Sequence, residues 1–144
     1  MSLMLCAECE LIEVKAPLAR GGFVLHPRIG RGAVPGWWVI APKRHVEQYD
    51  ELARDEQSHL GELIGELSAA LRASTPTEKI YVSIFAEVLP HLHVHVIARP
   101  PDFPHAERGP KIFLSDRAPD AAEIAAIAAR VTARLSGTAE KPGG

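Results

Sequence analysis

The chain has few cysteines, little net charge and no long apolar run, and each shortage excludes a class of protein. Two cysteines, Cys6 and Cys9, are too few for a secreted domain held by disulfides, so we expect a protein of the reducing cytoplasm. No segment approaches the roughly 18 apolar residues of a membrane span, so no membrane partner is expected. The net charge of −2 argues against nucleic acid as a partner, although a local site can still hold a nucleotide.

Several catalytic signatures are also missing. The sequence contains no serine nucleophile elbow, no glycine-rich phosphate loop and no HExxH helix. What remains is the composition of an ordinary globular protein, with 47% hydrophobic and 24% charged residues among 144. We therefore expect a single domain over residues 1–137, followed by a disordered tail over residues 138–144.

Hydrophobic periodicity predicts an α+β fold, with an antiparallel sheet and two main helices. Apolar residues at helical spacing indicate a helix over about residues 54–73. A second helix is expected from Pro119 to Gly137. Predicted strands cover residues 23–25, 37–41, 79–86 and 91–97. The last two strands should form an antiparallel hairpin through the short link at residues 88–90.

Three histidines alternate with apolar residues in the last predicted strand. His91, His93 and His95 should share one face of the sheet, because side chains alternate along a strand. A buried core histidine would explain one of them but not three in register. A strand rise of about 3.3 Å per residue puts the Cα atoms of His91 and His95 roughly 13 Å apart. These two rings can hardly bind one metal ion, so we expect the three histidines to divide their work.

Imidazole chemistry indicates different roles for the three histidines. A neutral imidazole is available at cellular pH and can act as a nucleophile. A second histidine two residues away can polarise a phosphoryl oxygen as charge develops in the transition state. The pattern therefore favours attack at phosphorus, which gives a phosphoramidate that water then cleaves.

The residues around these histidines resemble the histidine triad (HIT) family. The mark of that family is His-φ-His-φ-His-φ-φ with φ apolar, and His91 to Ile97 match it at every position. The Pro35-Gly36 turn and the segment Pro42-Lys43-Arg44-His45 are similar to the family's Pro-Gly and Pro-Lys-x-His segments. The resemblance covers about residues 6–136.

This resemblance implies an activity and a set of roles. The activity is nucleotidyl hydrolysis or transfer at an α-phosphate, on nucleoside phosphoramidates or dinucleoside polyphosphates. The middle histidine, His93, would be the nucleophile, His95 would assist at the phosphate, and His91 would lie beside them. The family also implies a homodimer whose central sheets continue across the interface.

The CxxC motif of Cys6 and Cys9 has two interpretations. A redox role of the thioredoxin type would need a surrounding βαβ unit, which the sequence lacks. In HIT proteins with such a motif, structural zinc is completed by the Pro-Lys-x-His histidine and the first triad histidine, which correspond to His45 and His91. Plain reduced thiols are the alternative.

The sequence departs from the HIT pattern at several substrate-binding positions. Trp37 stands where many members have a histidine that helps to position the nucleophile. Residues 86–90 replace the usual Gly-Gln-Ser or Gly-Gln-Thr, so Glu87 and Trp37 become the candidate substrate-binding residues. No acid for the ribose lies between Glu13 and Glu47, and His26 stands near its place. These losses favour an alternative function, a non-catalytic nucleotide-binding or zinc-stabilised regulatory protein.

Overall fold

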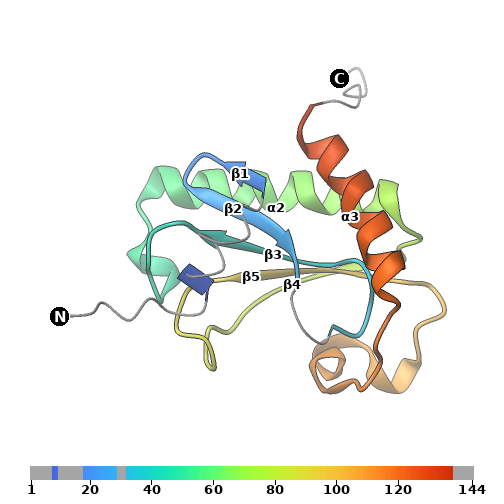
Figure 1. Cartoon of the computed structure of the whole chain (residues 1–144). Helices are drawn as coiled ribbons and strands as arrows, with labels where there is room; N and C mark the ends of the chain where they lie inside the picture. The colour runs from blue at the N-terminus through green and yellow to red at the C-terminus, as the bar shows by residue number, and fades with distance from the viewer. Residues whose placement is uncertain (1–7, 10–17, 29–31, 138–144) are drawn as a thin grey trace.

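A computed structural model describes residues 8–9, 18–28 and 32–137. In these ranges five antiparallel strands form one sheet in the order β1-β2-β3-β5-β4 (Figure 1). The strands are β1 (Leu18–Arg20), β2 (Phe23–Pro27), β3 (Trp37–Pro42), β4 (Lys79–Ile84) and β5 (Val94–Arg99). The α+β class with an antiparallel sheet is therefore confirmed.

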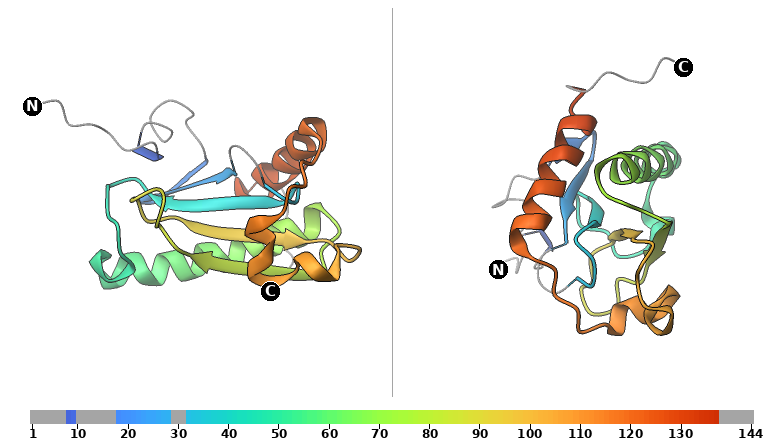
Figure 2. Two further views of the ribbon diagram at one scale, coloured as in Figure 1. Left: turned by 90° about the horizontal axis from the view of Figure 1, so that it is seen from below. Right: turned by 90° about the vertical axis from the view of Figure 1, so that its right-hand side faces the viewer.

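Two long helices cover one face of this sheet, α2 (Arg54–Ser74) and α3 (Ala121–Leu135). In α2 the apolar residues predicted to form one face, including Leu60, Leu63 and Leu67, are buried. They pack in one core with residues of α3 and of the covered sheet face, where Leu25, Ile40 and Val94 form a cross-strand row. Figure 2 shows both helices against the sheet. No helix in the described ranges is long and apolar enough to cross a membrane.

The opposite face of the sheet carries the polar side chains. Because cross-strand partners share a face, the register places His26, Val39, His95 and Ser83 in one row across β2, β3, β5 and β4. A second apolar cluster lies beside this row. It joins the sheet to the segment after β5, and its buried members are Ala33, Val34, Trp37, Ile97, Phe103 and Ile112.

Some predicted boundaries are wrong. The triad strand begins at Val94 rather than His91, because the Leu92 amide bonds to the carbonyl of Val46, outside the β3 and β4 ladders. The last helix begins at Ala121 rather than Pro119, because the side chain of Asp120 caps it by accepting from the Ala122 amide. The link between β4 and β5 is longer than predicted, since β4 already ends at Ile84.

Several short elements were not predicted, among them the 3-10 helix η1 (Tyr49–Glu51). β1 pairs with β2 at one edge of the sheet. The proline-rich stretch after β5 contains two 3-10 helices, η2 (His105–Glu107) and η3 (Gly109–Leu114). The predicted disordered tail lies outside the described residues.

Candidate functional site

The three triad histidines lie where the chain enters β5, and they differ in exposure. His91 is fully buried, at 0% exposure, and His95 is 8% exposed. His93 between them is only partly buried. The rings of His93 and His95 lie edge to face, with centroids 4.9 Å apart. Of the three rings, the middle one is therefore the most accessible to a small molecule.

The backbone fixes the proton on the His93 ring. Nδ1 of His93 lies 2.7 Å from the carbonyl oxygen of His91. A carbonyl can only accept, so Nδ1 carries the proton and donates it. In the neutral ring, Nε2 then holds a lone pair. A backbone acceptor of this kind holds the tautomer that a nucleophilic imidazole requires.

Trp37 fixes the other tautomer in His95. The indole Nε1–H donates to Nδ1 of His95 over 3.0 Å, so the neutral His95 ring carries its proton on Nε2. Burial, together with the positive charges of His93 and Arg28, lowers the pKa of His95 to about 4. His95 is therefore a neutral hydrogen-bond donor near pH 7. Trp37 itself is 2% exposed.

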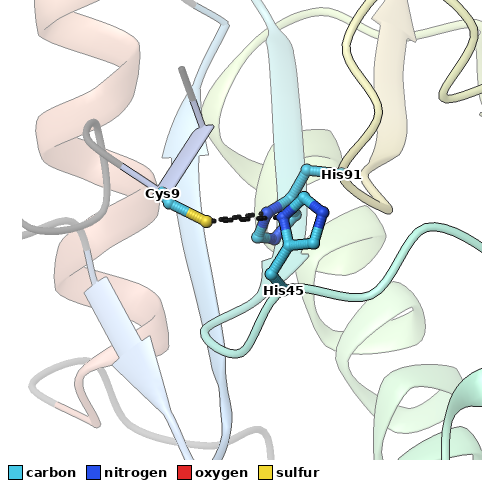
Figure 3. A group of neighbouring side chains, drawn as sticks. All are labelled: Cys9, His45 and His91. Atoms are coloured by element: carbon cyan, nitrogen blue, oxygen red, sulfur yellow. Dashed lines mark hydrogen bonds between the residues drawn. The ribbon is translucent and has the colours of Figure 1, made fainter. Parts of the chain in front are cut away.

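Cys9, His45 and His91 form a separate cluster with metal-ligand geometry (Figure 3). The Cys9 sulfur lies 3.6 Å from Nδ1 of His45 and 3.3 Å from Nδ1 of His91. Zinc bonds of about 2.3 Å to sulfur and about 2.1 Å to nitrogen at a tetrahedral angle separate such atoms by about 3.6 Å. The observed spacing therefore fits a shared zinc ion.

The His91 ring is also oriented as a metal ligand. Its Nε2 lies 2.8 Å from the carbonyl of Pro42 and so donates to it, which leaves the Nδ1 lone pair toward Cys9. Burial is the main cause that lowers the pKa of His91, so the neutral ligand form is favoured. Cys6, the fourth predicted ligand, lies outside the described residues.

A buried pair lies next to the cluster. Glu8, inside the CxxC motif, bonds through Oε1 to Nε2 of His26 over 2.9 Å, and both residues are 6% exposed. Burial raises the pKa of the Glu8 carboxyl. The opposing effects are together larger: the hydrogen bond and charge of His26, and the charges of His93 and His91, all lower this pKa. The net shift is downward, so Glu8 supplies negative charge close to the triad.

Glu87, the other predicted substrate-binding residue, is exposed in the loop before the triad. Its neighbour Ala86 has a positive φ of 52°, which is uncommon for a residue other than glycine. No described residue holds the Glu87 carboxylate in a hydrogen bond or ion pair. The structure therefore leaves this side chain open to solvent on the loop.

Two residues near His95 had no signal in the sequence. The guanidinium of Arg28 lies 4.1 Å from the centre of the Trp37 ring, and its charge acts on His95. Phe113 of η3 contacts both His95 and Trp37, with ring centroids 5.1 and 5.0 Å away. Both residues come from loops or short helices, which no periodic pattern marks.

Together these groups can carry out a specific kind of chemistry. The site offers an accessible imidazole nitrogen with a lone pair, a neutral N–H donor beside it, and nearby cationic and anionic side chains. Such a set suits attack on an electrophile whose oxygen gains negative charge.

The chain is similar to known proteins in both sequence and fold. The family model described as the HIT domain matches residues 30–102. A histidine triad protein from Sinorhizobium meliloti is 30% identical, with a TM-score of 0.60 over 69% of this chain and 74% of that chain. No curated protein sequence matches the chain significantly.

Two more distant structures cover nearly the whole chain. A Zn-bound histidine triad family protein from Mycobacterium smegmatis is 20% identical, with a TM-score of 0.69 over 94% of this chain and 99% of that chain. A Hit-like protein involved in cell-cycle regulation from Bartonella henselae is 16% identical, with a TM-score of 0.71 over 90% and 96% of the two chains. At these identities the likeness extends to the fold alone.

Proposed function

The chain belongs to the histidine triad (HIT) family, and from this premise we propose that it is a nucleotidyl hydrolase or transferase with His93 as its nucleophile. Its substrate is a nucleoside phosphoramidate or a dinucleoside polyphosphate, attacked at the α-phosphate. The observation that carries the proposal is the hydrogen bond from His93 Nδ1 to the carbonyl of His91, which leaves Nε2 for attack.

The reaction proceeds in two displacements. In the first, Nε2 of His93 forms a bond to phosphorus, the bond to the amine or phosphate breaks, and the leaving group departs with its electron pair. A leaving amine takes a proton from solvent. In the second, water attacks phosphorus, the bond to His93 breaks, and one water proton returns to solvent. Because His93 keeps its Nδ1 proton, the intermediate ring is cationic, and the carbonyl of His91 and the charge of Glu8 favour it.

His95 assists this reaction as a hydrogen-bond donor. Its Nε2–H can bind a phosphoryl oxygen, since Nδ1 is occupied by Trp37. The low pKa of His95 keeps the ring neutral, so His93 has no second fixed cation beside it when it becomes charged. We propose that Trp37 positions His95, and that Glu87 lies on the side of its loop that faces the substrate.

Zinc is the metal that the donor set of the CxxC cluster fits. Cys9, His45 and His91 would hold the ion together with Cys6, and a site closed by four protein ligands is structural. The ion would tie the N-terminal segment to the chain just before His93. The Zn-bound relative from Mycobacterium smegmatis supports this proposal. In keeping with the family, we place the protein in the cytoplasm.

We also propose a homodimer joined through β4. This strand lies at the edge of the sheet, and Val82 and Ile84 on it are 46% and 39% exposed. An apolar, unpaired edge favours pairing with a second chain. Light scattering should give about twice the chain mass of 15.6 kDa at micromolar concentration. A monomer across the concentration range would remove the dimer but leave the catalytic proposal in place.

A second candidate is a non-catalytic, nucleotide-binding regulatory protein. The replaced phosphate loop, with Ala86 in a strained conformation and Glu87 exposed, favours it. The described role of the Bartonella henselae protein in cell-cycle regulation is compatible with it. Measured turnover decides between the two candidates.

The experiment compares variants on an adenosine phosphoramidate and a dinucleoside polyphosphate. His93→Asn should lose roughly 10⁴-fold or more in kcat, because no other nucleophile lies in register, while nucleotide binding survives. His95→Asn should lose about 10²–10⁴-fold. His91→Asn should mainly lower the melting temperature and should have a smaller effect on kcat.

His105→Asn is the matched control, since His105 is an exposed histidine outside the cluster. It should keep the parent rate. Near-parent rates for His93→Asn would overturn the nucleophile. If the parent turns over neither substrate, the regulatory candidate replaces the enzyme.

A further inference from the structure

A cationic side chain stacks on the indole that holds His95. Arg28 lies directly after β2, and its amide donates to the carbonyl of Trp37 over 2.8 Å. The two residues are therefore cross-strand neighbours just beyond the last pair of the β2–β3 ladder, and such neighbours share a face of the sheet. The guanidinium carbon of Arg28 lies 4.1 Å from the centre of the Trp37 ring, which is close enough for a cation–π contact.

In the part of the chain that the structure describes, the Trp37 ring is the one group that stacks on this guanidinium or pairs with it. The side chain is half-buried, and burial lowers the pKa of Arg28 with no acid to oppose it. The buried Arg99, by contrast, donates to the carboxylate of Glu78 over 2.8 Å. A partly desolvated cation without an acid is stabilised best by the electron-rich face of an indole, so the contact holds Arg28 and Trp37 together.

The orientation of the Trp37 ring decides which nitrogen of His95 carries the proton. The indole N–H donates to Nδ1 of His95 over 3.0 Å, and a rotation of the Trp37 side chain would break this bond. Two contacts oppose such a rotation, the Phe113 ring, whose centroid lies 5.0 Å away, and the guanidinium of Arg28 on the indole face. Without the indole donor, the proton could move to Nδ1, and Nε2 would present a lone pair instead of an N–H to a phosphoryl oxygen.

Arg28 also contributes to the charge around His95. Burial is the largest cause of the low pKa of His95, followed by the positive charges of His93 and Arg28, whereas the charge of Glu8 raises this pKa. The side chains that β3, β4 and η3 bring against the same ring or into its row carry no charge. Arg28 is thus the one permanent cation among these groups, because a histidine can lose its proton.

We propose that Arg28 is a positioning residue that acts on His95 through Trp37. The proposal rests on the function proposed above. By stacking on the indole, Arg28 keeps the Trp37 N–H on Nδ1 of His95, so that Nε2–H stays directed to the phosphoryl oxygen. Arg28 itself does not touch the substrate. Its loss should therefore weaken a hydrogen bond that strengthens in the transition state, which lowers kcat and leaves KM nearly unchanged.

The kinetic test uses an adenosine phosphoramidate as substrate. Arg28→Gln should lower kcat about tenfold with KM within about twofold of the parent value. Arg28→Lys, which keeps a cation above the indole, should recover most of that loss. In a Trp37→Phe background, which has no indole N–H, Arg28→Gln should add less than about a twofold loss. Arg54→Gln, the same change at an exposed arginine of α2, is the matched control and should keep the parent kcat.

Nitrogen NMR of the histidine rings separates this proposal from the proposed function, because it needs no turnover. With His95→Asn identifying the signals, the parent should show His95 protonated at Nε2 with a pKa of about 4. Arg28→Gln should mix the two neutral tautomers and raise this pKa, whereas Arg54→Gln should do neither. Unchanged His95 signals in Arg28→Gln would overturn the proposal. So would an effect confined to KM, which would place Arg28 on the substrate.

Discussion

At the scale of single residues, the neutral state of His95 links the site to stability. The folded protein holds this imidazole neutral down to about pH 4, because it is buried beside His93 and Arg28. In the unfolded chain a histidine binds a proton below about pH 6.5. Between these values the unfolded state binds more protons, so the free energy of unfolding falls as the pH falls.

This difference predicts an acid-sensitive stability. Between about pH 6.5 and pH 4, His95 should lower the free energy of unfolding by up to about 1.4 kcal/mol per pH unit. His95→Asn removes the titrating group and keeps an acceptor for Trp37. Urea unfolding at pH 7, 6 and 5 should therefore show a shallower pH dependence in the variant. The same slope in both proteins would contradict the prediction, since contributions from other groups are common to both.

The sequence predicts residue types and order better than residue contacts. It predicts His93 as a nucleophile, but the acceptor that fixes its Nδ1 proton, the carbonyl of His91, depends on a local bend that no pattern encodes. Trp37 was expected at the substrate and lies under His95. The contact between Glu8 and His26 joins segments 18 positions apart, and a single sequence holds no measure of such pairings.

At the scale of elements, Pro35-Gly36 shows why a turn leading into β3 requires a small residue. A Cβ on Gly36 would lie 2.9 Å from Cβ of Ala98 on β5 and 3.2 Å from Cγ2 of Thr75. The Gly36 carbonyl also accepts from the Ala98 amide. The close approach seats the start of β3 on the triad strand.

Gly36→Ala should therefore destabilise the protein by about 1–3 kcal/mol, because Ala98 lies on an inner strand and cannot move aside freely. Gly61→Ala is the matched control. A Cβ there meets nothing within 4 Å on α2, so this change should stabilise by about 0.5–1 kcal/mol through helix propensity. Chemical denaturation measures both. A Gly36→Ala protein as stable as the parent would contradict the prediction, because it would show that Ala98 and Thr75 can move aside without loss of stability.

Periodicity predicted the long elements well and the ends poorly. The helix expected over residues 54–73 ends only one residue later, at Ser74. Its ends are predicted well because more than five turns follow one consistent apolar pattern. The start of β5 was placed too early, since His91 and Leu92 continue the alternation while their backbone bonds elsewhere. Three-residue β1 and the 3-10 helices are too short for any period to be measured.

At the scale of the whole molecule, the cluster of Cys9, His45 and His91 joins three distant parts of the chain. Cys9 precedes the sheet, His45 follows β3 and His91 precedes β5. A metal that binds only the native fold raises the free energy of unfolding by RT ln(1 + [L]/Kd), where [L] is the concentration of free metal. Without it, only packing and hydrogen bonds hold these segments together.

Removal of zinc should therefore lower the melting temperature. Protein purified without added metal should contain about one zinc per chain, and a strong chelator should lower stability by several kcal/mol. Cys9→Ala should melt lower than the parent and respond less to chelator. His93→Asn, which leaves the ligands intact, should respond as the parent does. Metal-free protein whose melting is unchanged by chelator would refute the zinc site.

The order of the strands has a consequence for folding kinetics. β4 and β5 are neighbours in sequence and can pair early, together with α2, whereas β3 must close a long loop to reach β5. Both tryptophans of the chain, Trp37 and Trp38, lie on β3. Their fluorescence during refolding therefore reports the docking of β3 on β5. The same docking brings the indole of Trp37 to His95, so His95 acquires its defined proton position only in that step.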